Sequence, residues 1–447
     1  MKLFGTDGIR GKAGTTPLDP ETISRVGAAL VRALGTSTPA RPVRVLIGRD
    51  TRESGEWIAD ALTGGLASER ASVVSVGVLP TPAIAFLTRT EGFDAGIMIS
   101  ASHNPYGDNG IKIFSGRGEK LDVGFESTIE QLVADSTWTV RAGPRPQSIA
   151  PELTEHYVGH LREILPDAGP LAGSRLVVDC AHGATTAIAP ALFRGLGFDV
   201  VTIGDEPNGR NINLNCGSTH LHVLQAKVIE QSARLGVAFD GDGDRALFVD
   251  RHGTAVDGDA ILLMSAQQLQ REGRLPGSAI VATVMSNIGL ERALRDRGIG
   301  LVRAPVGDKY VMEEMLKRGL ALGGEQSGHI IFADHLFTGD GIGTALQVFR
   351  IMAATGRELD ELAGELVTYP QVLLGVRVRE RTDYMTIPAI ADSIRRVEQR
   401  LGDQGRLLIR YSGTEPLLRI MLEGKDEAEI REWANQIAET VTEQIGE

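Results

Sequence analysis

Three aspartates alternate with glycines directly after an apolar run of residues. They are Asp240, Asp242 and Asp244, and Arg245 follows them. In an extended chain, residues two apart face the same way, so the three carboxylates are expected to converge. Carboxylate oxygens with this charge suit Mg²⁺, which prefers six oxygen ligands and commonly completes its shell with phosphate or water. The pattern therefore predicts a magnesium site at the end of a strand.

Two other interpretations of this aspartate segment stay open. A merely solvated turn would leave three neighbouring carboxylates to repel one another. An aspartyl phosphatase of the DxDx(T/V) type is a rival chemistry, although Asp244 occupies its Thr/Val position. An EF-hand is excluded, because its loop needs Gly at the sixth position and Glu at the twelfth, where Arg245 and Arg251 stand.

A serine follows a second apolar run, within the segment SASHNP at 100–105. Open α/β sheets place their active sites at the carboxyl ends of parallel strands, which is where Ser102 is expected to lie. A free serine is a weak nucleophile and needs an activating neighbour, for which His103 and Lys112 are candidates. An Asn-Pro turn with a capping serine is the alternative.

A third loop, GGEQSGH at 323–329, carries polar groups suited to a sugar phosphate. Glu325 and Ser327 could accept hydrogen bonds from sugar hydroxyls or donate to them. His329 could bind phosphate or move protons. A glycine-rich β-turn with incidental polar residues is the alternative.

The fourth loop, RYSGTEP at 410–416, is suited to binding phosphate rather than to chemistry. It offers an arginine, two hydroxyls and backbone N–H groups exposed by glycine, and it contains neither an acid–base pair nor a set of metal ligands. The binding candidates are Arg410, Ser412, Gly413, Thr414 and, beyond the loop, Arg419. A surface hairpin turn is the alternative.

The elements that must position these loops follow a repeated pattern. Over the first two-thirds of the chain, short apolar runs alternate with longer amphipathic ones, which indicates three α/β units with mainly parallel strands. The predicted strands are 43–47, 71–78, 95–99, 175–179, 200–203, 236–239, 279–283 and 301–303. The predicted helices are 53–68, 184–196, 259–271 and 309–318.

The end of the chain has a different pattern, which predicts a compact α+β module. Its expected strands are 373–378, 406–411 and 417–423, and its expected helices are 383–401 and 427–444. The segments 141–149 and 368–371 are predicted linkers.

Composition narrows the function classes. The 447 residues are 42% hydrophobic and 23% charged, as in a globular protein, and no segment approaches the ~20 apolar residues of a membrane span. A formal net charge of −12 disfavours bulk binding to nucleic acid. Cys180 and Cys216 are too few for a disulfide framework, and the amino terminus lacks an apolar leader, so a cytoplasmic protein is expected.

At all four loops, in order and over the whole chain, the sequence resembles the α-D-phosphohexomutase family. The resemblance implies three related mixed-sheet α/β domains and a carboxy-terminal α+β phosphate-binding domain around a central cleft. The expected domains are 1–152 with the serine loop, 153–254 with the aspartates, 255–368 with the sugar loop, and 369–447 with the distal phosphate site.

The resemblance also implies a role for each candidate residue. Ser102 corresponds to the phosphorylated serine, whose phosphate joins the three aspartates as a metal ligand, and Lys112 to the family's general acid/base. The other implied roles are phosphate contacts at Arg10 and Arg245, a second proton carrier at His329, substrate contacts at His103, Glu325 and Ser327, and distal phosphate contacts at Arg410, Ser412, Gly413, Thr414 and Arg419.

Further segments resemble the subgroup that acts on glucosamine phosphates. They are FGTDGIRG at 4–11, DCAHGA at 179–184, NINLNCGS at 211–218, GDKYV at 307–311, and Gln326. The implied reaction interconverts D-glucosamine 6-phosphate and α-D-glucosamine 1-phosphate through a phosphoserine and a 1,6-bisphosphate, and it supplies UDP-N-acetylglucosamine for cell-wall synthesis. Glucosamine or glucose 1,6-bisphosphate would be the primer.

The alternatives are a phosphomannomutase or phosphoglucomutase of the same family, and a metal-dependent sugar phosphatase. The expected partner is a hexosamine phosphate, without nucleic acid or membrane insertion, and a homodimer is compatible with the sequence.

Overall fold

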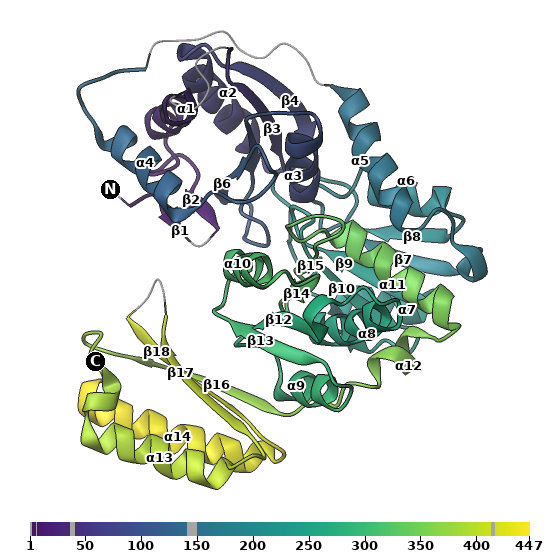
Figure 1. Cartoon of the computed structure of the whole chain (residues 1–447), viewed down its shortest axis with the longest axis vertical. Coiled ribbons are helices and arrows are strands. Elements are labelled where there is room, and N and C mark those ends of the chain that lie inside the picture. The colour runs from purple at the N-terminus through teal and green to yellow at the C-terminus, as the bar shows by residue number, and fades with distance from the viewer. Residues whose placement is uncertain (1, 6, 36–40, 141–149, 413–415) are drawn as a thin grey trace. The chain divides into compact units, whose positions relative to one another are not determined.

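A computed structural model describes residues 2–5, 7–35, 41–140, 150–412 and 416–447 (Figure 1). The chain forms two compact units, one of Met1–Met285 with Ile299–Glu365 and one of Ser286–Gly298 with Leu366–Glu447. Among the described residues, no helix is both long enough and apolar enough to cross a membrane. The predicted linker 141–149 lies outside the described residues.

The first sheet of the larger unit has six strands in the order β1-β2-β6-β5-β3-β4. Strand β3 is parallel to β4 and β5, whereas β6, β2 and β1 are antiparallel to their neighbours, so the sheet is mixed. Its strands are β1 (Phe4–Gly5), β2 (Gly8–Lys12), β3 (Arg44–Arg49), β4 (Ser72–Val78), β5 (Ala95–Ile99) and β6 (Asp108–Ser115). The accompanying helices are α1 (Pro20–Gly35), α2 (Gly55–Ser68), α3 (Thr81–Thr90) and α4 (Val123–Ala134).

The second sheet has five strands in the order β11-β10-β9-β7-β8. Strands β8, β7 and β9 are parallel, and β10 and β11 return antiparallel. The strands are β7 (Arg175–Asp179), β8 (Asp199–Ile203), β9 (Leu235–Phe239), β10 (Ala246–Asp250) and β11 (Ala255–Val256). The helices are α5 (Pro151–Ile164), η1 (Gly169–Leu171), α6 (Ala189–Gly195) and α7 (His222–Glu230).

The third sheet has four strands in the order β13-β12-β14-β15, of which the last is antiparallel. They are β12 (Ala279–Thr283), β13 (Gly300–Ala304), β14 (Leu322–Gly324) and β15 (Ile330–Phe332). The helices of this part are α8 (Gly258–Arg271), η2 (Pro276–Ser278), α10 (Asp308–Arg318), α11 (Gly341–Thr355) and α12 (Leu359–Ala363).

The smaller unit is an antiparallel three-stranded sheet, β16-β18-β17, with two long helices packed on its apolar face. Its strands are β16 (Gln371–Arg377), β17 (Arg406–Tyr411) and β18 (Leu417–Glu423). Its helices are α9 (Ile288–Arg295), η3 (Tyr384–Thr386), α13 (Pro388–Leu401) and α14 (Glu427–Ile445). The fold class predicted from the sequence, α/β units followed by an α+β module, is confirmed.

Three predicted helices begin later than expected. The helix predicted over 53–68 begins two residues late, at Gly55, and the other two begin five residues late. The helix predicted over 383–401 begins at Pro388, because the residue before a proline disfavours the helical conformation, and Ile387 is extended with φ −92° and ψ 110°. The helix predicted over 184–196 begins at Ala189, after turns in which Ala181 and His182 have positive φ.

Close packing of α1 on α2 depends on a glycine. A Cβ at Gly65 would fall on the carbonyl oxygen of Ser24, whereas a Cβ at the adjacent Gly64 would meet nothing within 4 Å. The two glycines therefore occupy one helix with opposite steric requirements.

Replacing each glycine by alanine tests this packing. Gly65→Ala should lower the free energy of unfolding by roughly 1–3 kcal/mol, because the helices must separate. Gly64→Ala should raise it by about 0.5–1 kcal/mol, because alanine loses less backbone entropy in a helix. Urea denaturation measures both, and equal effects of the two substitutions would contradict the close approach.

Candidate active site

Ser102 lies in the loop that follows the fully buried strand β5. Its Oγ donates a hydrogen bond to Asp240 Oδ2 at 2.5 Å and lies 3.4 Å from His103 Nδ1. Its φ is +53°, a left-handed conformation that serine rarely adopts. The structure therefore brings the predicted nucleophile onto the predicted metal-binding segment, although the two are separated by more than a hundred residues.

The aspartates follow strand β9, as expected, but the prediction that they converge through an extended chain is wrong. The segment turns: the Gly243 N–H donates to the Asp240 carbonyl at 3.1 Å, and Gly243 has φ +71°. The turn brings one oxygen of each carboxylate within 4.8 Å of the others, and all three residues are buried. Glycine is required for the positive φ, and a Cβ there would also lie 2.6 Å from Thr185 Cγ2.

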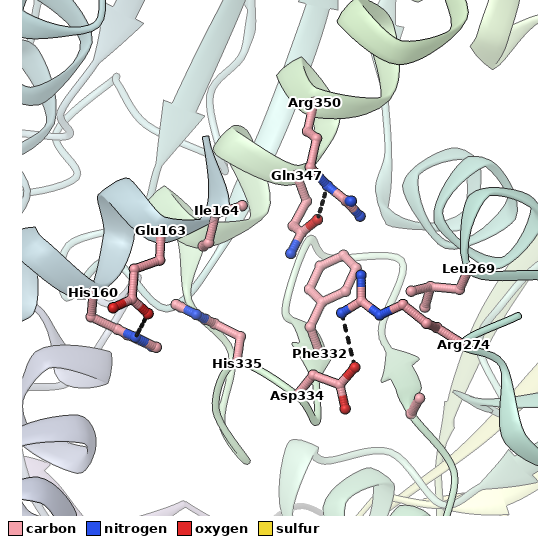
Figure 2. A pocket seen from close by; sticks show the side chains of 11 residues that line it. His160, Glu163, Ile164, Leu269, Arg274, Phe332, Asp334, His335, Gln347 and Arg350 are labelled. Atoms are coloured by element: carbon pink, nitrogen blue, oxygen red, sulfur yellow. Dashed lines mark hydrogen bonds and ion pairs between the residues drawn. The ribbon is translucent and has the colours of Figure 1, made fainter. Parts of the chain in front are cut away.

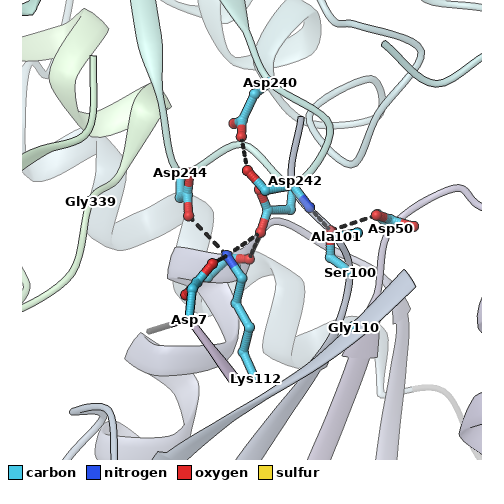
Figure 3. A network of polar contacts seen from close by, with 12 residues as sticks. Asp7, Asp50, Ser100, Ala101, Gly110, Lys112, Asp240, Asp242, Asp244 and Gly339 are labelled. Carbon is cyan, nitrogen blue, oxygen red and sulfur yellow. Dashed lines mark hydrogen bonds and ion pairs between the residues drawn. The ribbon is translucent and has the colours of Figure 1, made fainter. Parts of the chain in front are cut away.

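Lysine supplies the positive charge that this cluster needs (Figure 3). Lys112, on β6 and 2% exposed, places its Nζ 2.8 Å from Asp242 Oδ2, 3.1 Å from Asp244 Oδ2 and 3.2 Å from Asp7 Oδ2. Burial alone would lower the pKa of Lys112, but these carboxylates outweigh it and hold that pKa well above its ordinary value. Lys112 is therefore an ammonium ion in this arrangement.

The surroundings shift the pKa values of Asp240 and Asp244 in opposite directions. Burial, together with the charges of Asp244 and Asp242, raises the pKa of Asp240 well above its ordinary value. Burial opposes the charge on Asp244 as well, but Lys112 and His329 outweigh it and keep the pKa of Asp244 well below its usual range. The neighbouring cations therefore do not fully offset the negative charge of the cluster, and Asp240 is the carboxyl group whose ionisation is disfavoured.

The cluster fits a cation. Among the described residues, Asp242 Oδ1 and Asp244 Oδ1 are buried without a hydrogen-bond partner, so each oxygen has a free lone pair inside the site. A second group of possible ligands, Asp244, Asp308 and His329, shares Asp244 with the first. All donors in the triad are hard carboxylate oxygens, which favours a hard divalent ion.

His329 lies against the same cluster, and its surroundings shift its pKa in opposing directions. Burial would lower its pKa, but Asp244 and Asp308 outweigh it and raise that pKa. Its Nε2, however, accepts a hydrogen bond from the Gly339 N–H at 3.0 Å, which requires that Nε2 carry no proton. Because a cation on Asp244 would cancel the attraction of that carboxylate, the neutral ring with its hydrogen on Nδ1 is expected in the metal-loaded site.

Two arginines provide donors for an anion beside Ser102. Among the described residues, Arg10 Nε and Arg245 Nε are buried and lack hydrogen-bond partners. Arg10 Nη1 donates to the Ala101 carbonyl at 3.3 Å, and the Arg245 N–H donates to Asp240 Oδ1 at 3.2 Å, so both residues are attached to the site. Burial and these two cations lower the pKa of His103 to about 4.

The predicted sugar-binding residues lie in the tight turn between β14 and β15. Glu325 Oε1 accepts from the Gly307 N–H at 3.1 Å, and Glu325 Oε2 accepts from Ser327 Oγ at 3.3 Å. Gly328, with φ +90°, closes the turn by donating to the Glu325 carbonyl. The loop therefore holds Glu325 and Ser327 next to each other.

The fourth predicted loop belongs to the smaller unit. Arg410 on β17 and Arg419 on β18 are directly opposite in register, a repulsive pairing. Burial and Arg419 lower the pKa of Arg410, and neither arginine has an ion-pair partner within the described part of the chain. Ser412 is buried beside them, whereas Gly413 and Thr414 lie outside the described residues. Two unpaired arginines are an arrangement that an anion would stabilise.

A separate cavity of about 200 Å³ lies in the larger unit (Figure 2). Its two arginines already have partners: Arg274 donates to Asp334 at 2.9 Å, and Arg350 donates to Glu272 at 2.9 Å and to Gln347 at 3.0 Å. His160 stacks on His335 with ring centroids 4.1 Å apart. Since no predicted site residue lines it and its cations are already paired, this cavity is not a candidate phosphate site.

Sequence reasoning assigned no role to the residues that hold the site together, although Asp7 and Asn213 lie in segments that resemble the subgroup. Asp7 and Lys120 link Lys112 to Asp308, and Thr81 Oγ1 donates to Asp242 Oδ2 at 2.5 Å. Asp50, Arg52 and Asn213 hold the serine loop. The only signal for Arg52 was its place in the short segment between the predicted strand 43–47 and the predicted helix 53–68.

Models of the phosphoglucomutase/phosphomannomutase family match the chain in four consecutive parts. Alpha/beta/alpha domains I, II and III match residues 1–139, 155–253 and 257–369, and the C-terminal domain matches residues 373–440. The chain belongs to this family, and it is an isomerase of the phosphohexomutase class.

Among curated proteins, the chain is similar to enzymes named phosphoglucosamine mutase. It is 51% identical over 449 residues to the phosphoglucosamine mutase of Solibacter usitatus, covering 100% of this chain and 99% of that protein. It is 48% identical over 454 residues to the phosphoglucosamine mutase of Desulforudis audaxviator, covering 99% and 98%. A solved family protein from Burkholderia thailandensis has a TM-score of 0.80 at 25% identity, covering 98% of this chain and 97% of that one.

Removing the ammonium of Lys112 tests the charge balance of the cluster. Lys112→Met should lower the free energy of unfolding of the metal-free protein by about 3–5 kcal/mol, because it leaves buried carboxylates unpaired. Added Mg²⁺ should then raise the melting temperature of the variant more than that of the wild type. Scanning calorimetry with and without Mg²⁺ measures both effects.

Lys309→Met is the matched control. Lys309 is also buried and forms one ion pair, with Glu126 at 3.0 Å, away from the aspartates. The Lys309→Met variant should be less stable than the wild type, but added Mg²⁺ should raise its melting temperature no more than that of the wild type. An equal response in both variants would mean that the aspartate cluster does not hold the cation.

Proposed function

We propose that the chain is a phosphoglucosamine mutase, which interconverts glucosamine 6-phosphate and glucosamine 1-phosphate through a phosphorylated Ser102. The observation that carries the proposal is the 2.5 Å hydrogen bond from Ser102 Oγ to Asp240, beside two buried guanidinium donors. The names of relatives at about half identity support the amino-sugar substrate. This reaction would supply UDP-N-acetylglucosamine and cell-wall synthesis.

Phosphorylation changes the contact between Ser102 and Asp240. The hydroxyl loses the hydrogen that it now donates, and a phosphate dianion then faces a carboxylate. Asp240, Asp242 and Asp244, with a phosphate oxygen on Ser102, would hold Mg²⁺ at that position. When bound, the ion would neutralise charge on the transferring group. Arg10 and Arg245 would donate their free N–H groups to the same phosphoryl oxygens.

The two predicted proton carriers suit different roles. Lys112, whose pKa the carboxylates hold well above its ordinary value, can donate a proton or stabilise charge but is a poor base. Neutral His329 directs Nδ1 at Asp244 and accepts from the Gly339 N–H at Nε2, so Nε2 would have to give up that hydrogen bond to take a proton. We therefore assign Lys112 to the acid and electrostatic role and His329 to proton transfer with the sugar hydroxyl.

The remaining residues are proposed to hold the substrate. Glu325 and Ser327 would bind sugar hydroxyls, and His103 the reacting phosphate region. The distal phosphate would be bound by Arg410, Ser412, Gly413, Thr414 and Arg419. A hexosamine or glucose 1,6-bisphosphate would serve both as intermediate and as the primer that phosphorylates Ser102.

A metal-dependent phosphatase is the alternative reaction. An aspartyl phosphatase needs a free aspartate nucleophile, whereas Asp240 Oδ2 accepts from Ser102 and Asp240 Oδ1 accepts from the Arg245 N–H. Both oxygens of the first aspartate are therefore engaged, which favours the serine as the group that takes the phosphate. Phosphomannomutase and phosphoglucomutase activities differ only in the sugar.

We also propose the four-domain division at 1–152, 153–254, 255–368 and 369–447, and a cytoplasmic location without nucleic-acid partners. Two buried free cysteines support a reducing compartment. A homodimer stays a prediction.

Ser102→Ala tests the proposed function. It should abolish mutase turnover, because no other hydroxyl of the loop contacts Asp240 among the described residues. The fold should stay intact. After incubation with the bisphosphate, intact-mass analysis should show one added phosphate on the wild type and none on the variant. Substantial turnover by Ser102→Ala would exclude the phosphoserine mechanism.

Arg410→Ala tests the distal phosphate site. A charge-assisted contact contributes about 1.5–3 kcal/mol, so kcat/KM should fall roughly 10- to 150-fold in both directions. Free bisphosphate should also escape during turnover, because the intermediate is held less well while it reorients.

Arg431→Ala is the control, because the one ion-pair partner of Arg431 among the described residues is Glu427, on the surface of α14. It should leave both directions unchanged. Unaltered KM values in Arg410→Ala, without released bisphosphate, would mean that the smaller unit does not hold the distal phosphate.

A further inference from the structure

Arg52 is a fully buried arginine that no predicted loop contains. It lies between β3 and α2 and is 1% exposed. Its Nη2 donates to the carbonyls of Ser102 at 2.9 Å and Asn104 at 2.8 Å, and its Nη1 donates to the carbonyls of Asp108 at 3.0 Å and Pro105. Its Nε donates to Asp50 at 2.9 Å, so all five N–H groups of the guanidinium are used.

Asn213 binds two of the same carbonyls from the second sheet's part of the unit. Its Nδ2 donates to the Ser102 carbonyl at 2.9 Å and to the Asn104 carbonyl at 3.1 Å. Each of these two carbonyls therefore accepts one bond from Arg52 and one from Asn213. The serine loop is fixed between the segment that follows β3 and the segment that precedes α7.

Asp50 completes the arrangement on the other side of the loop. Its Oδ2 accepts from Ser100 Oγ at 2.6 Å, and Ser100 Oγ accepts from the Ser102 N–H at 2.9 Å. Both peptide groups that flank the Ser102 Cα are thus hydrogen-bonded to buried side chains. A left-handed serine is unfavourable by itself and persists where surrounding contacts over-determine it.

We propose that Arg52 and Asn213 are positioning residues for phosphoryl transfer. By binding the carbonyls of Ser102 and Asn104, they keep Ser102 in its left-handed conformation and keep its Oγ directed at Asp240. The inference rests on the proposed function, because it assigns Ser102 as the phosphoryl acceptor. Neither side chain needs to touch the substrate, so their loss should change the rate of transfer rather than substrate affinity.

Arg52→Lys and Asn213→Gly test the proposal. Lysine keeps the charge but cannot reach four carbonyls, and glycine tolerates the φ of +59° at position 213, so only the side-chain contacts are lost. Because a displacement of about 1 Å costs on the order of 100-fold in rate, kcat should fall roughly 10- to 100-fold while KM for glucosamine 6-phosphate stays within about threefold. Phosphorylation of Ser102 by the bisphosphate should slow equally.

Arg25→Lys is the matched control. Arg25 also binds backbone carbonyls, those of Val133 at 3.0 Å and Trp138 at 2.9 Å, but far from Ser102 in the hydrogen-bond network. It should cost stability without changing kcat. Hydrogen–deuterium exchange of the unphosphorylated proteins without substrate should show faster exchange at 100–109 in Arg52→Lys and Asn213→Gly only.

The outcomes separate this inference from the proposed function. Wild-type exchange at 100–109 in both variants, or a loss of kcat no larger than in Arg25→Lys, would overturn the positioning role. A raised KM at normal kcat would also overturn it, by making these residues substrate contacts. If Arg52→Lys does not fold, Asn213→Gly decides alone. A wild type without mutase turnover would instead overturn the proposed function and leave the exchange result standing.

Discussion

The structure depends on burying three carboxylates side by side next to a serine. Two like charges about 4 Å apart repel by several kcal/mol at the effective dielectric of a protein interior. Such a cluster can be stable only where cations are brought to it. Lys112 does so from β6 and Arg245 from the end of the aspartate turn, and His329 faces Asp244 from the turn before β15. Charge compensation therefore explains why three sheets of one unit meet at this point.

The compensation is incomplete, and this is what gives the site its chemistry. Asp242 Oδ1, Asp244 Oδ1, Arg10 Nε and Arg245 Nε lack hydrogen-bond partners in the described structure, although Arg245 Nε lies 3.8 Å from Asp244 Oδ1. Buried acceptors and buried donors without hydrogen bonds therefore occur in one site, which suits the binding of a cation and an anion together. The proposed metal and the proposed phosphoryl group supply that pair, and each makes binding of the other more favourable.

Sequence reasoning could predict where the reactive loops are, because they follow apolar strands whose bounds are easy to assign. The strands at 95–99, 175–179 and 279–283 have the predicted bounds, and Ser102 and Asp240 follow buried strands as expected. The geometry inside a loop was harder. The aspartates converge through a turn that Gly243 permits, since local backbone conformation at glycine is not fixed by periodicity.

Contacts between distant segments could not be predicted from the sequence. Arg52 belongs to no predicted motif, and the segment around Asn213 was identified by resemblance alone. Neither pattern indicates the two backbone carbonyls that both side chains bind. Lys112 was predicted as a site residue from its place after Ser102 and from resemblance, but its three carboxylate partners, and hence its charge, follow only from the fold.

A ³¹P NMR time course on glucosamine 6-phosphate, with Mg²⁺ and a trace of the 1,6-bisphosphate, tests the central claim most directly. The claim is that the charge-compensated cluster passes a phosphoryl group between Ser102 and the sugar without releasing it to water. The account predicts that the 6-phosphate resonance declines as a 1-phosphate resonance grows, while their sum stays constant. Growth of an inorganic phosphate resonance at the expense of both would contradict it.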